Sequence, residues 1–292
     1  MHNAHQAGPR LTNAEEIDRA LATTAREESL VVDGVRIAYR VWDSPAAVST
    51  LVLIHGGAAH SHWWDAVAPL LVGTDRVVAV DLSGHGESER RPEYGVPLWA
   101  AEVETVARHA SVGEITLIGH SLGGLVSTRL ATHSGSRFAG AIAVDSLINN
   151  TAGGDSDRTS FGSLGERVYA SFDDAVARFR PVPYQASDPR VGPHVARMSV
   201  RATEGGWTWK FDPRVFAGPR FAARPVGLTT RYAFIRAEHG LLPPDVGDLV
   251  REAGGVYVEL PEAGHAPMLD RPLALTTAIR EILAPWRAPQ AD

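Results

Sequence analysis

The chain has 292 residues and no cysteine. Disulfide scaffolds, thiolate metal sites and cysteine nucleophiles are therefore all excluded. Lysine is nearly absent too, because Lys210 is the single lysine among 28 basic residues. No apolar run approaches the ~20 residues that a membrane-spanning helix needs, so we expect no membrane partner.

The charge is of the wrong sign for a nucleic-acid partner. The formal net charge is -6, whereas binding to phosphates needs a basic field. Residues 1–9 lack the basic start and apolar core of a secretion signal, so we expect a polar tail on a cytoplasmic protein. Hydrophobic residues make up 44% of the chain, which predicts a globular protein with one large domain.

Short apolar runs alternate with helical patterns along most of the sequence. After a predicted hairpin over residues 30–41, runs of this kind lie at Thr50–Ile54, Val77–Val80, Ile115–Ile118, Ala141–Val144, Tyr232–Ile235 and Val256–Leu260. Predicted helices lie at Trp63–Leu71, Pro97–His109, Leu122–His133, Pro244–Ala253 and Arg271–Leu283. Runs of four to six apolar residues are typical of parallel strands that are buried on both faces. The alternation predicts an α/β fold, with a mostly parallel central sheet flanked by helices.

One long segment interrupts this alternation and predicts an insertion. Between Val144 and Tyr232 there is no apolar strand run, and proline is frequent. A structureless loop of that length is implausible in a compact domain, so we expect a mostly helical cap over residues 147–226. Residues 29–146 and 227–292 then form the core. Residues 1–28 form an N-terminal tail and a short helix that Thr12 or Asn13 caps and that runs through Arg26.

The sequence Gly119-His120-Ser121-Leu122-Gly123 follows a predicted strand and opens a predicted helix. It is a G-x-S-x-G motif in the strand–turn–helix context that this motif requires. Such a turn projects the serine hydroxyl from the sheet edge, and the helix N-terminus places a backbone N–H beside the reacting oxygen. Ser121 is thus the candidate nucleophile.

With this motif in place, the chain resembles the α/β-hydrolase-fold serine hydrolases, in particular their capped esterase-like and lactonase-like members. Three further motifs support the resemblance, each after its own strand: His55-Gly56-Gly57-Ala58-Ala59, Asp81-Leu82-Ser83-Gly84-His85-Gly86-Glu87-Ser88, and Gly264-His265. The resemblance covers residues 30–286. It implies the α/β-hydrolase fold with an inserted helical cap domain.

The resemblance also suggests roles for individual residues. A serine hydroxyl needs a base within hydrogen-bond reach, and His265 is the candidate. The oxyanion hole is expected to use the backbone N–H groups of Gly57 and Leu122, with Ala58 as an alternative donor.

The triad acid is where this sequence departs from the family pattern. The family usually places an aspartate two residues after the position of Glu238, where this chain has Gly240. Asp145, which ends the strand Ala141–Val144, is the favoured substitute, and Glu238 is the alternative. Asp245, or no acid at all, remains open. The triad needs a carboxylate that fixes the tautomer of His265, and geometry decides which one does so.

Four tryptophans are candidates for the substrate pocket. Trp63 and Trp64 follow the oxyanion loop, and we expect one to line the pocket and the other to pack in the core. Trp207 and Trp209 share one side of an extended stretch, so they either cover the pocket or attach the cap.

The group His55, His60 and His62 raises the question of a metal. Because no acidic or thiol partner is evident for these histidines, we expect neither a metal nor a cofactor.

The predicted function is a carboxylic-ester hydrolase with a Ser-His-acid triad. It would cleave an ester, lactone or thioester of a small or medium apolar molecule through an acyl-serine intermediate. Three activities on the same fold are alternatives: carbon–carbon hydrolysis, cofactor-free perhydrolysis and a lyase reaction. A second alternative is a non-catalytic ligand-binding protein. The sequence leaves the oligomeric state open.

Overall fold

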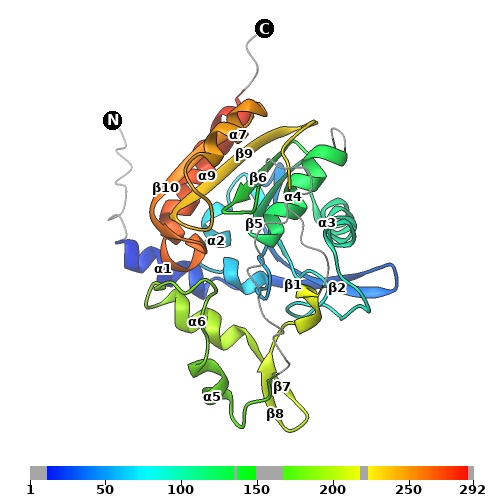
Figure 1. Cartoon of the computed structure of the whole chain (residues 1–292), viewed down its shortest axis with the longest axis vertical. Coiled ribbons are helices and arrows are strands. Elements are labelled where there is room, and N and C mark those ends of the chain that lie inside the picture. Colours follow the sequence, from blue (N-terminus) through cyan, green and yellow to red (C-terminus); the bar gives the residue numbers. More distant parts are fainter. Residues whose placement is uncertain (1–11, 135–136, 149–166, 218–222, 289–292) are drawn as a thin grey trace, which may run out of the picture.

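A computed structural model of the chain describes residues 12–134, 137–148, 167–217 and 223–288. Its centre is an eight-stranded sheet with strand order β1-β2-β4-β3-β5-β6-β9-β10 (Figure 1). The strands are β1 (Arg26–Val32), β2 (Val35–Trp42), β3 (Ser49–Ile54), β4 (Asp75–Val80), β5 (Glu114–His120), β6 (Gly140–Val144), β9 (Arg231–His239) and β10 (Val256–Gly264). The pairs β1–β2 and β2–β4 are antiparallel, and the other pairs are parallel. The predicted α/β class is therefore confirmed.

Helices cover both faces of the sheet and close two hydrophobic cores. They are α1 (Asn13–Ala22), α2 (Ala68–Leu71), α3 (Val96–Ala110), α4 (Leu122–His133), α7 (Val246–Glu252), α8 (Pro267–Asp270) and α9 (Pro272–Arg287). One core joins the sheet to α1, α2, α8 and α9, and the other joins it to α3, α4 and α7. The inner parallel strands β3, β5, β6 and β9 are buried on both faces because their apolar side chains enter both cores, whereas several side chains of the edge strand β10 are exposed.

The N-terminal region differs from its prediction in one respect. Helix α1 begins after Thr12, which forms a capping box with Glu15, but it ends at Ala22 and does not reach Arg26. Thr23 has extended backbone angles, and Arg26 is already paired with Val41 across the first hairpin. Residues 26–28 thus belong to the sheet. Residues 1–11, which include the predicted tail, lie outside the described residues.

The segment between β6 and β9 is not wholly helical. Its described residues form α5 (Phe172–Ala177), α6 (Val191–Met198), an antiparallel pair β7 (Val200–Thr203) and β8 (Gly206–Trp209), and a 3-10 turn η3 (Pro213–Phe216). These elements gather at one end of the molecule, at the bottom of Figure 1. Two parts of the predicted cap, residues 149–166 and 218–222, lie outside the described residues.

None of the helices in the described ranges is long and apolar enough to cross a membrane.

Candidate active site

Ser121 lies in the tight turn between β5 and α4. Its backbone has φ 51° and ψ -113°, a left-handed conformation that side chains other than glycine rarely adopt. The turn depends on close approach at two glycines. A Cβ at Gly119 would lie 2.0 Å from the carbonyl oxygen of Gly123, and a Cβ at Gly123 would lie 2.2 Å from that of Ile54. The motif therefore builds the strained turn that exposes the serine hydroxyl.

His265 lies directly after β10 and contacts two other candidate residues. Its Nε2 is 3.2 Å from Ser121 Oγ, and its Nδ1 is 2.7 Å from Asp145 Oδ2. Asp145 directly follows β6, is fully buried, and has a positive φ of 39°. The backbone N–H groups of Ala237 and Leu241 also donate to its carboxylate, at 3.2 Å and 2.9 Å. The structure therefore places a hydroxyl, an imidazole and a fixed carboxylate in one continuous series of contacts.

The other candidate acids lie elsewhere. The side chain of Glu238 is exposed, and its Oε2 accepts a hydrogen bond from the N–H of Glu262 at 2.7 Å. Asp245 is exposed just before α7. A Cβ built on Gly240 would lie 2.2 Å from Asp145 Oδ1, so the carboxylate of Asp145 fills the space that a side chain at position 240 would need.

Gly57 and Leu122 line the same cavity as Ser121. Leu122 is the first residue of α4, where an N–H has no acceptor within the helix. Within the described residues, no acceptor is found for the N–H of Leu122 or of Gly57. These two donors are therefore free to bind a developing negative charge on a ligand.

His55 fixes the peptide that carries the Gly57 N–H. Its Nε2 accepts from the N–H of Leu82 at 3.1 Å, so the proton is on Nδ1, which donates to the carbonyl of Gly56 at 2.7 Å. Carbonyl and N–H point in opposite directions from a trans peptide, so holding the carbonyl of Gly56 also sets the direction of the Gly57 N–H. Burial lowers the pKa of His55 to about 4, which keeps this ring neutral.

His120 is a residue of the site whose role sequence reasoning missed. It occupies the variable position of G-x-S-x-G, so the motif gave no signal for it. Its Nε2–H donates to the carbonyl of His265 at 2.8 Å, and the two rings lie 4.8 Å apart. Burial holds its pKa well below the usual value, and its Nδ1 has no partner within the described residues. His120 therefore fixes the backbone of His265 while remaining uncharged.

The motif that begins at Asp81 forms a supporting turn. The carboxylate of Asp81 accepts from the N–H groups of Ser61 and Glu87, at 2.6 Å and 2.9 Å. The hydroxyl of Ser88 donates to the Asp81 carbonyl at 2.6 Å. Ser61 opens η1 (Ser61–Trp64), so this turn attaches the segment after the oxyanion loop to the end of β4.

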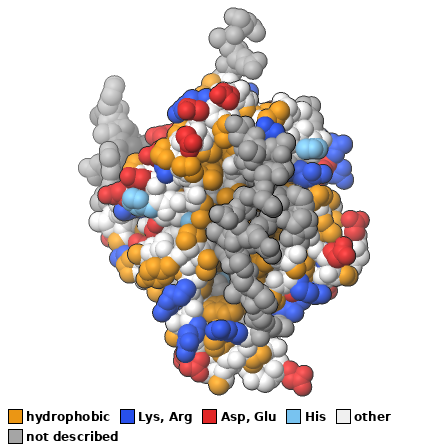
Figure 2. All heavy atoms as spheres, in the orientation of Figure 1, with side chains coloured by type: hydrophobic (Ala, Val, Ile, Leu, Met, Phe, Trp, Pro, Cys, Tyr) orange, Lys and Arg blue, Asp and Glu red, His pale blue; other side chains and the backbone are white. Residues whose placement is uncertain are grey.

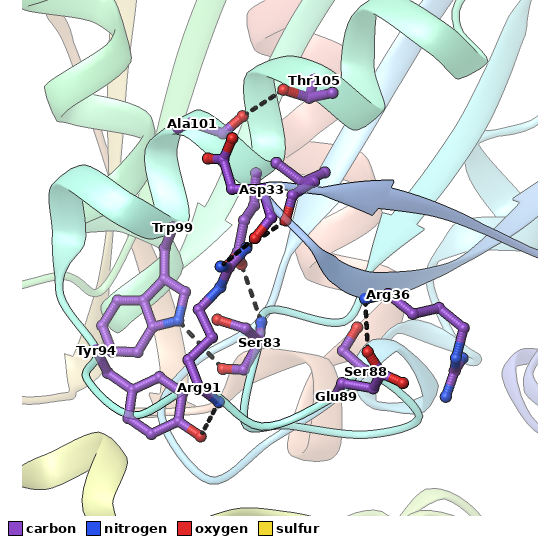
Figure 3. Close-up of polar contacts among 12 residues, drawn as sticks. Asp33, Arg36, Ser83, Ser88, Glu89, Arg91, Tyr94, Trp99, Ala101 and Thr105 are labelled. Carbon is purple, nitrogen blue, oxygen red and sulfur yellow. Dashed lines mark hydrogen bonds and ion pairs between the residues drawn. The ribbon is translucent and has the colours of Figure 1, made fainter.

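Next to this turn, the aromatic side chains of Tyr94 and Trp99 lie beside each other (Figure 3), and both line the cavity. The Nε1–H of Trp99 donates to the carbonyl of Ser83 at 3.2 Å, and the hydroxyl of Tyr94 accepts from the N–H of Arg91 at 3.0 Å. The same hydroxyl donates to Asp212 at 2.9 Å, so this wall is tied to the segment between β6 and β9. The two rings stack with centroids 6.0 Å apart.

Ser121 and His265 open into a cavity of about 530 Å³. Trp63 and Trp209 line it, whereas Trp64 is fully buried in the core and Trp207 packs edge-on against Phe172, 5.0 Å between ring centroids. The described lining is otherwise largely aromatic and aliphatic, and it includes Tyr94, Trp99, Leu125, Tyr169, Phe179, Phe211, Val215 and Phe216. A volume of this size suits a small or medium organic molecule.

The arrangement of sheet, turn and cavity is that of a known class of protein. The model of the alpha/beta hydrolase family matches residues 51–278, and the chain belongs to this family.

Several individual proteins are similar to this chain over most of its length. The chain is 28% identical to the esterase Rv0045c of Mycobacterium tuberculosis, over 96% of this chain and 93% of that protein. It is 25% identical to a pimeloyl-[acyl-carrier protein] methyl ester esterase of Neisseria meningitidis, over 82% of this chain and 95% of that protein. A crystal structure of the hypothetical protein PA1622 from Pseudomonas aeruginosa superposes with a TM-score of 0.74 at 26% identity, over 90% and 99% of the two chains. These relatives support a hydrolase of esterase type.

Proposed function

We propose that the protein is a carboxylic-ester hydrolase that works through an acyl-serine intermediate. The observation that carries the proposal is the chain of contacts from Ser121 Oγ to His265 Nε2, and from His265 Nδ1 to Asp145, at the floor of an apolar cavity. This is the geometry in which an imidazole activates a serine hydroxyl and a carboxylate orients the imidazole. The similarity to esterases supports the same chemistry.

In the first half-reaction, Ser121 Oγ attacks the carbonyl carbon of the ester while its proton passes to His265 Nε2. The carbonyl oxygen becomes an oxyanion that accepts hydrogen bonds from the N–H groups of Gly57 and Leu122. When the tetrahedral intermediate collapses, the bond to the leaving oxygen breaks, and His265 returns the proton to the departing alcohol. The product is an acyl ester of Ser121.

In the second half-reaction, water replaces the alcohol. His265 takes a proton from the water, the hydroxide attacks the acyl carbon, and the bond to Ser121 Oγ breaks as the serine regains its proton. Asp145 stays ionised throughout and stabilises the imidazolium that forms twice in each cycle. No step calls for a group beyond these side chains, the two backbone donors and water.

The lining of the cavity supports an apolar acyl or alcohol group as the part of the substrate that is bound. Trp63, from η1, and Trp209, from β8, both contribute aromatic surface to this cavity. Burial of apolar surface against such rings favours binding of an apolar group. We therefore propose esters or thioesters with a medium-length carbon chain.

Labelling with a fluorophosphonate probe tests the proposal. The probe reacts with an activated serine, and mass spectrometry identifies the modified residue. We expect rapid labelling at Ser121, none in Ser121→Ala, and hydrolysis of p-nitrophenyl esters that depends on acyl chain length. A matched control is Ser127→Ala, since the hydroxyl of Ser127 only donates to the carbonyl of Gly123 within α4. Absence of labelling at Ser121 in the folded protein would contradict the proposal.

A further inference from the structure

A second cluster of polar side chains lies apart from the contacts between Ser121, His265 and Asp145. Asp65, directly after η1, accepts two hydrogen bonds on the same carboxylate oxygen. His62 Nδ1 is 2.8 Å from Asp65 Oδ2, and His194 Nε2 is 2.7 Å from it. His62 belongs to η1 in the core, whereas His194 belongs to α6 in the segment between β6 and β9. The cluster therefore joins two parts of the chain that are far apart in sequence.

The cluster has the composition and spacing of a metal site. The three candidate ligand atoms all lie within 4.8 Å of one another. Two imidazole nitrogens and one carboxylate oxygen form a ligand set typical of Zn²⁺ and related divalent ions with an open position for water. The 3-10 geometry of η1 brings His62 and Asp65, three residues apart, onto one side of the turn.

The surroundings hold the three groups in place. The guanidinium of Arg40 pairs with the other oxygen of Asp65, which leaves Oδ2 facing the two histidines. The side chain of Asp65 is 7% exposed, and those of His62 and His194 are 15% and 22% exposed. The site is thus largely desolvated but open on the histidine side, where an ion and its water can enter. A neighbour that orients a ligand in this way raises metal affinity, although the positive charge of Arg40 opposes it.

The remaining histidines of the region have other partners. His60 Nε2 is 2.9 Å from the hydroxyl of Ser199, and His55 is bonded to the backbone of Gly56 and Leu82. The group of histidines considered from sequence alone, His55, His60 and His62, therefore does not converge. The carboxylate of the cluster belongs to Asp65, three residues after His62, and the second imidazole belongs to His194 on α6.

We propose that His62, Asp65 and His194 bind a divalent transition-metal ion of the Zn²⁺ class. His62 Nδ1 and His194 Nε2 then present their lone pairs to the ion, and each ring carries its proton on its other nitrogen. The ion thus takes the place of the two protons that now form hydrogen bonds to Asp65. Water completes the coordination. The ion ties α6 to η1, directly beside Trp63 of the cavity wall.

The test separates metal binding from a simple hydrogen-bond cluster. Asparagine at position 62 and glutamine at position 194 each keep an amide N–H where the imidazole N–H now donates, but neither is a good metal ligand. The variants are His62→Asn and His194→Gln. His109→Gln, on the exposed surface of α3, is the matched control. All chains are prepared without an affinity tag and carry His2→Gln and His5→Gln, so that N-terminal histidines do not bind the ion.

Two readouts follow, and both are independent of activity. Titration with Co²⁺ reports four-coordinate nitrogen and oxygen ligation by visible absorption, and thermal unfolding with ZnCl₂ reports stabilisation of the folded state. For the wild type and His109→Gln we expect one bound Co²⁺ and a Tm that rises by about 5 °C at a hundredfold excess of Zn²⁺ over Kd. In His62→Asn and His194→Gln the affinity should fall at least about tenfold.

Two outcomes would overturn the proposal. If the wild type takes up no Co²⁺ and its Tm does not respond to Zn²⁺, the cluster is a hydrogen-bonded contact only. If the wild type binds but both variants bind equally well, the ion lies elsewhere on the chain.

Discussion

At the scale of single residues, the carboxylate of Asp145 occupies the space beside Gly240 that an aspartate side chain at position 240 would fill. The two arrangements are mutually exclusive, because a Cβ at Gly240 would come within 2.3 Å of both oxygens of Asp145. In this structure the position of the Asp145 carboxylate therefore leaves room only for glycine at position 240. The glycine that looked like a missing acid is a steric requirement of the carboxylate that faces His265.

We predict that Asp145→Asn lowers kcat by about 10⁴-fold with little change in KM, because the amide no longer stabilises the imidazolium of His265. Glu238→Gln should leave kcat within about twofold, since the Glu238 carboxylate caps the N–H of Glu262 outside the site. Steady-state kinetics on a p-nitrophenyl ester measures both. Equal losses in the two variants would argue against Asp145 as the acid.

A rescue experiment tests the steric relation directly. Asp145→Ala vacates the space beside position 240, so adding Gly240→Asp should restore at least about tenfold of the lost kcat. Gly240→Asp alone should be inactive or unstable, because its side chain collides with the carboxylate of Asp145. Full activity of Gly240→Asp alone would show that the two positions do not compete.

The sequence indicated the candidate residues Ser121 and His265 more directly than it indicated the contacts that they make. Ser121 and His265 follow strands in motifs that can be read locally. The choice between Asp145 and Glu238 depends on the pairing of β6 with β9, where Val144 lies opposite Ile235, and no local pattern reports that pairing. The contact of His194 with Asp65 was missed for the same reason, since these two residues are 129 residues apart.

At the scale of elements, the position of Ser121 depends on how closely α4 packs against β3. This contact exists because Gly123 has no side chain: a Cβ at that position would lie 2.2 Å from the carbonyl oxygen of Ile54 and 2.7 Å from that of His55. The carbonyl oxygens belong to the backbone and have little freedom to move away. The helix that carries the Leu122 N–H is thereby held next to the loop that carries the Gly57 N–H.

We predict that Gly123→Ala costs about 1–3 kcal/mol in the free energy of unfolding and also lowers kcat, because the new methyl group forces α4 away from β3. Urea unfolding and ester kinetics measure the two effects. Gly73→Ala is the control: no atom lies within 4 Å of its Cβ position, so its free energy of unfolding should change by less than about 0.5 kcal/mol. A Gly123→Ala variant as stable and active as the control would contradict the argument.

The elements could be predicted where the apolar pattern is strong. Each of the six predicted core runs lies within an observed strand. Five of these strands are largely buried on both faces of the sheet, as a continuous apolar run predicts, whereas the sixth, β10, lies at the edge and is only partly buried. The segment between β6 and β9 was harder. The pair β7–β8 is only four residues long on each side, so its alternating Trp207 and Trp209 gave a signal for extended chain but not for a hairpin.

At the scale of the whole molecule, the buried histidines make stability depend on pH. His55, His60, His85 and His120 are all buried. Burial lowers the pKa of His55 to about 4 and that of His85 to about 3, and it lowers those of His60 and His120 as well. In the unfolded chain each of them titrates near 6.5. Their contribution to stability is therefore complete above about pH 6.5 and is lost as the pH falls toward the folded-state pKa values.

We predict that the free energy of unfolding falls steeply between pH 6.5 and 5, by up to about 1.4 kcal/mol per pH unit for each such histidine. Burial raises the pKa of Asp81 and Glu102, which acts in the opposite direction at lower pH. Urea unfolding at several pH values gives the slope. His85→Asn should reduce this slope by the equivalent of about one bound proton, whereas the control His109→Gln should leave it unchanged. A free energy of unfolding that rises as the pH falls from 6.5 to 5 would contradict the prediction.

The distribution of charge over the molecule bears on the substrate. The chain carries a net charge of -6, yet Arg167, Arg178 and Arg180 are the only lining residues with a full charge among the described residues of the cavity, histidines aside. All three are exposed. Figure 2 shows basic side chains over the end of the molecule that carries α5 to β8. An acyl chain that ends in an anionic group would place apolar carbon against the aromatic lining and its charge near these arginines.

We therefore predict that the p-nitrophenyl monoester of a dicarboxylic acid has a lower KM than a neutral ester of the same chain length. Exposed ion pairs contribute about 0.2–1 kcal/mol each, so the ratio should be about tenfold at low salt. It should shrink as NaCl rises, because screening weakens exposed pairs. Combined Arg→Gln substitutions at 167, 178 and 180 should abolish the preference while kcat on the neutral ester stays the same. Arg197→Gln, which removes an arginine stacked on Phe172 outside the cavity lining, is the control. A salt-independent KM ratio near one would mean that the arginines do not contact the substrate.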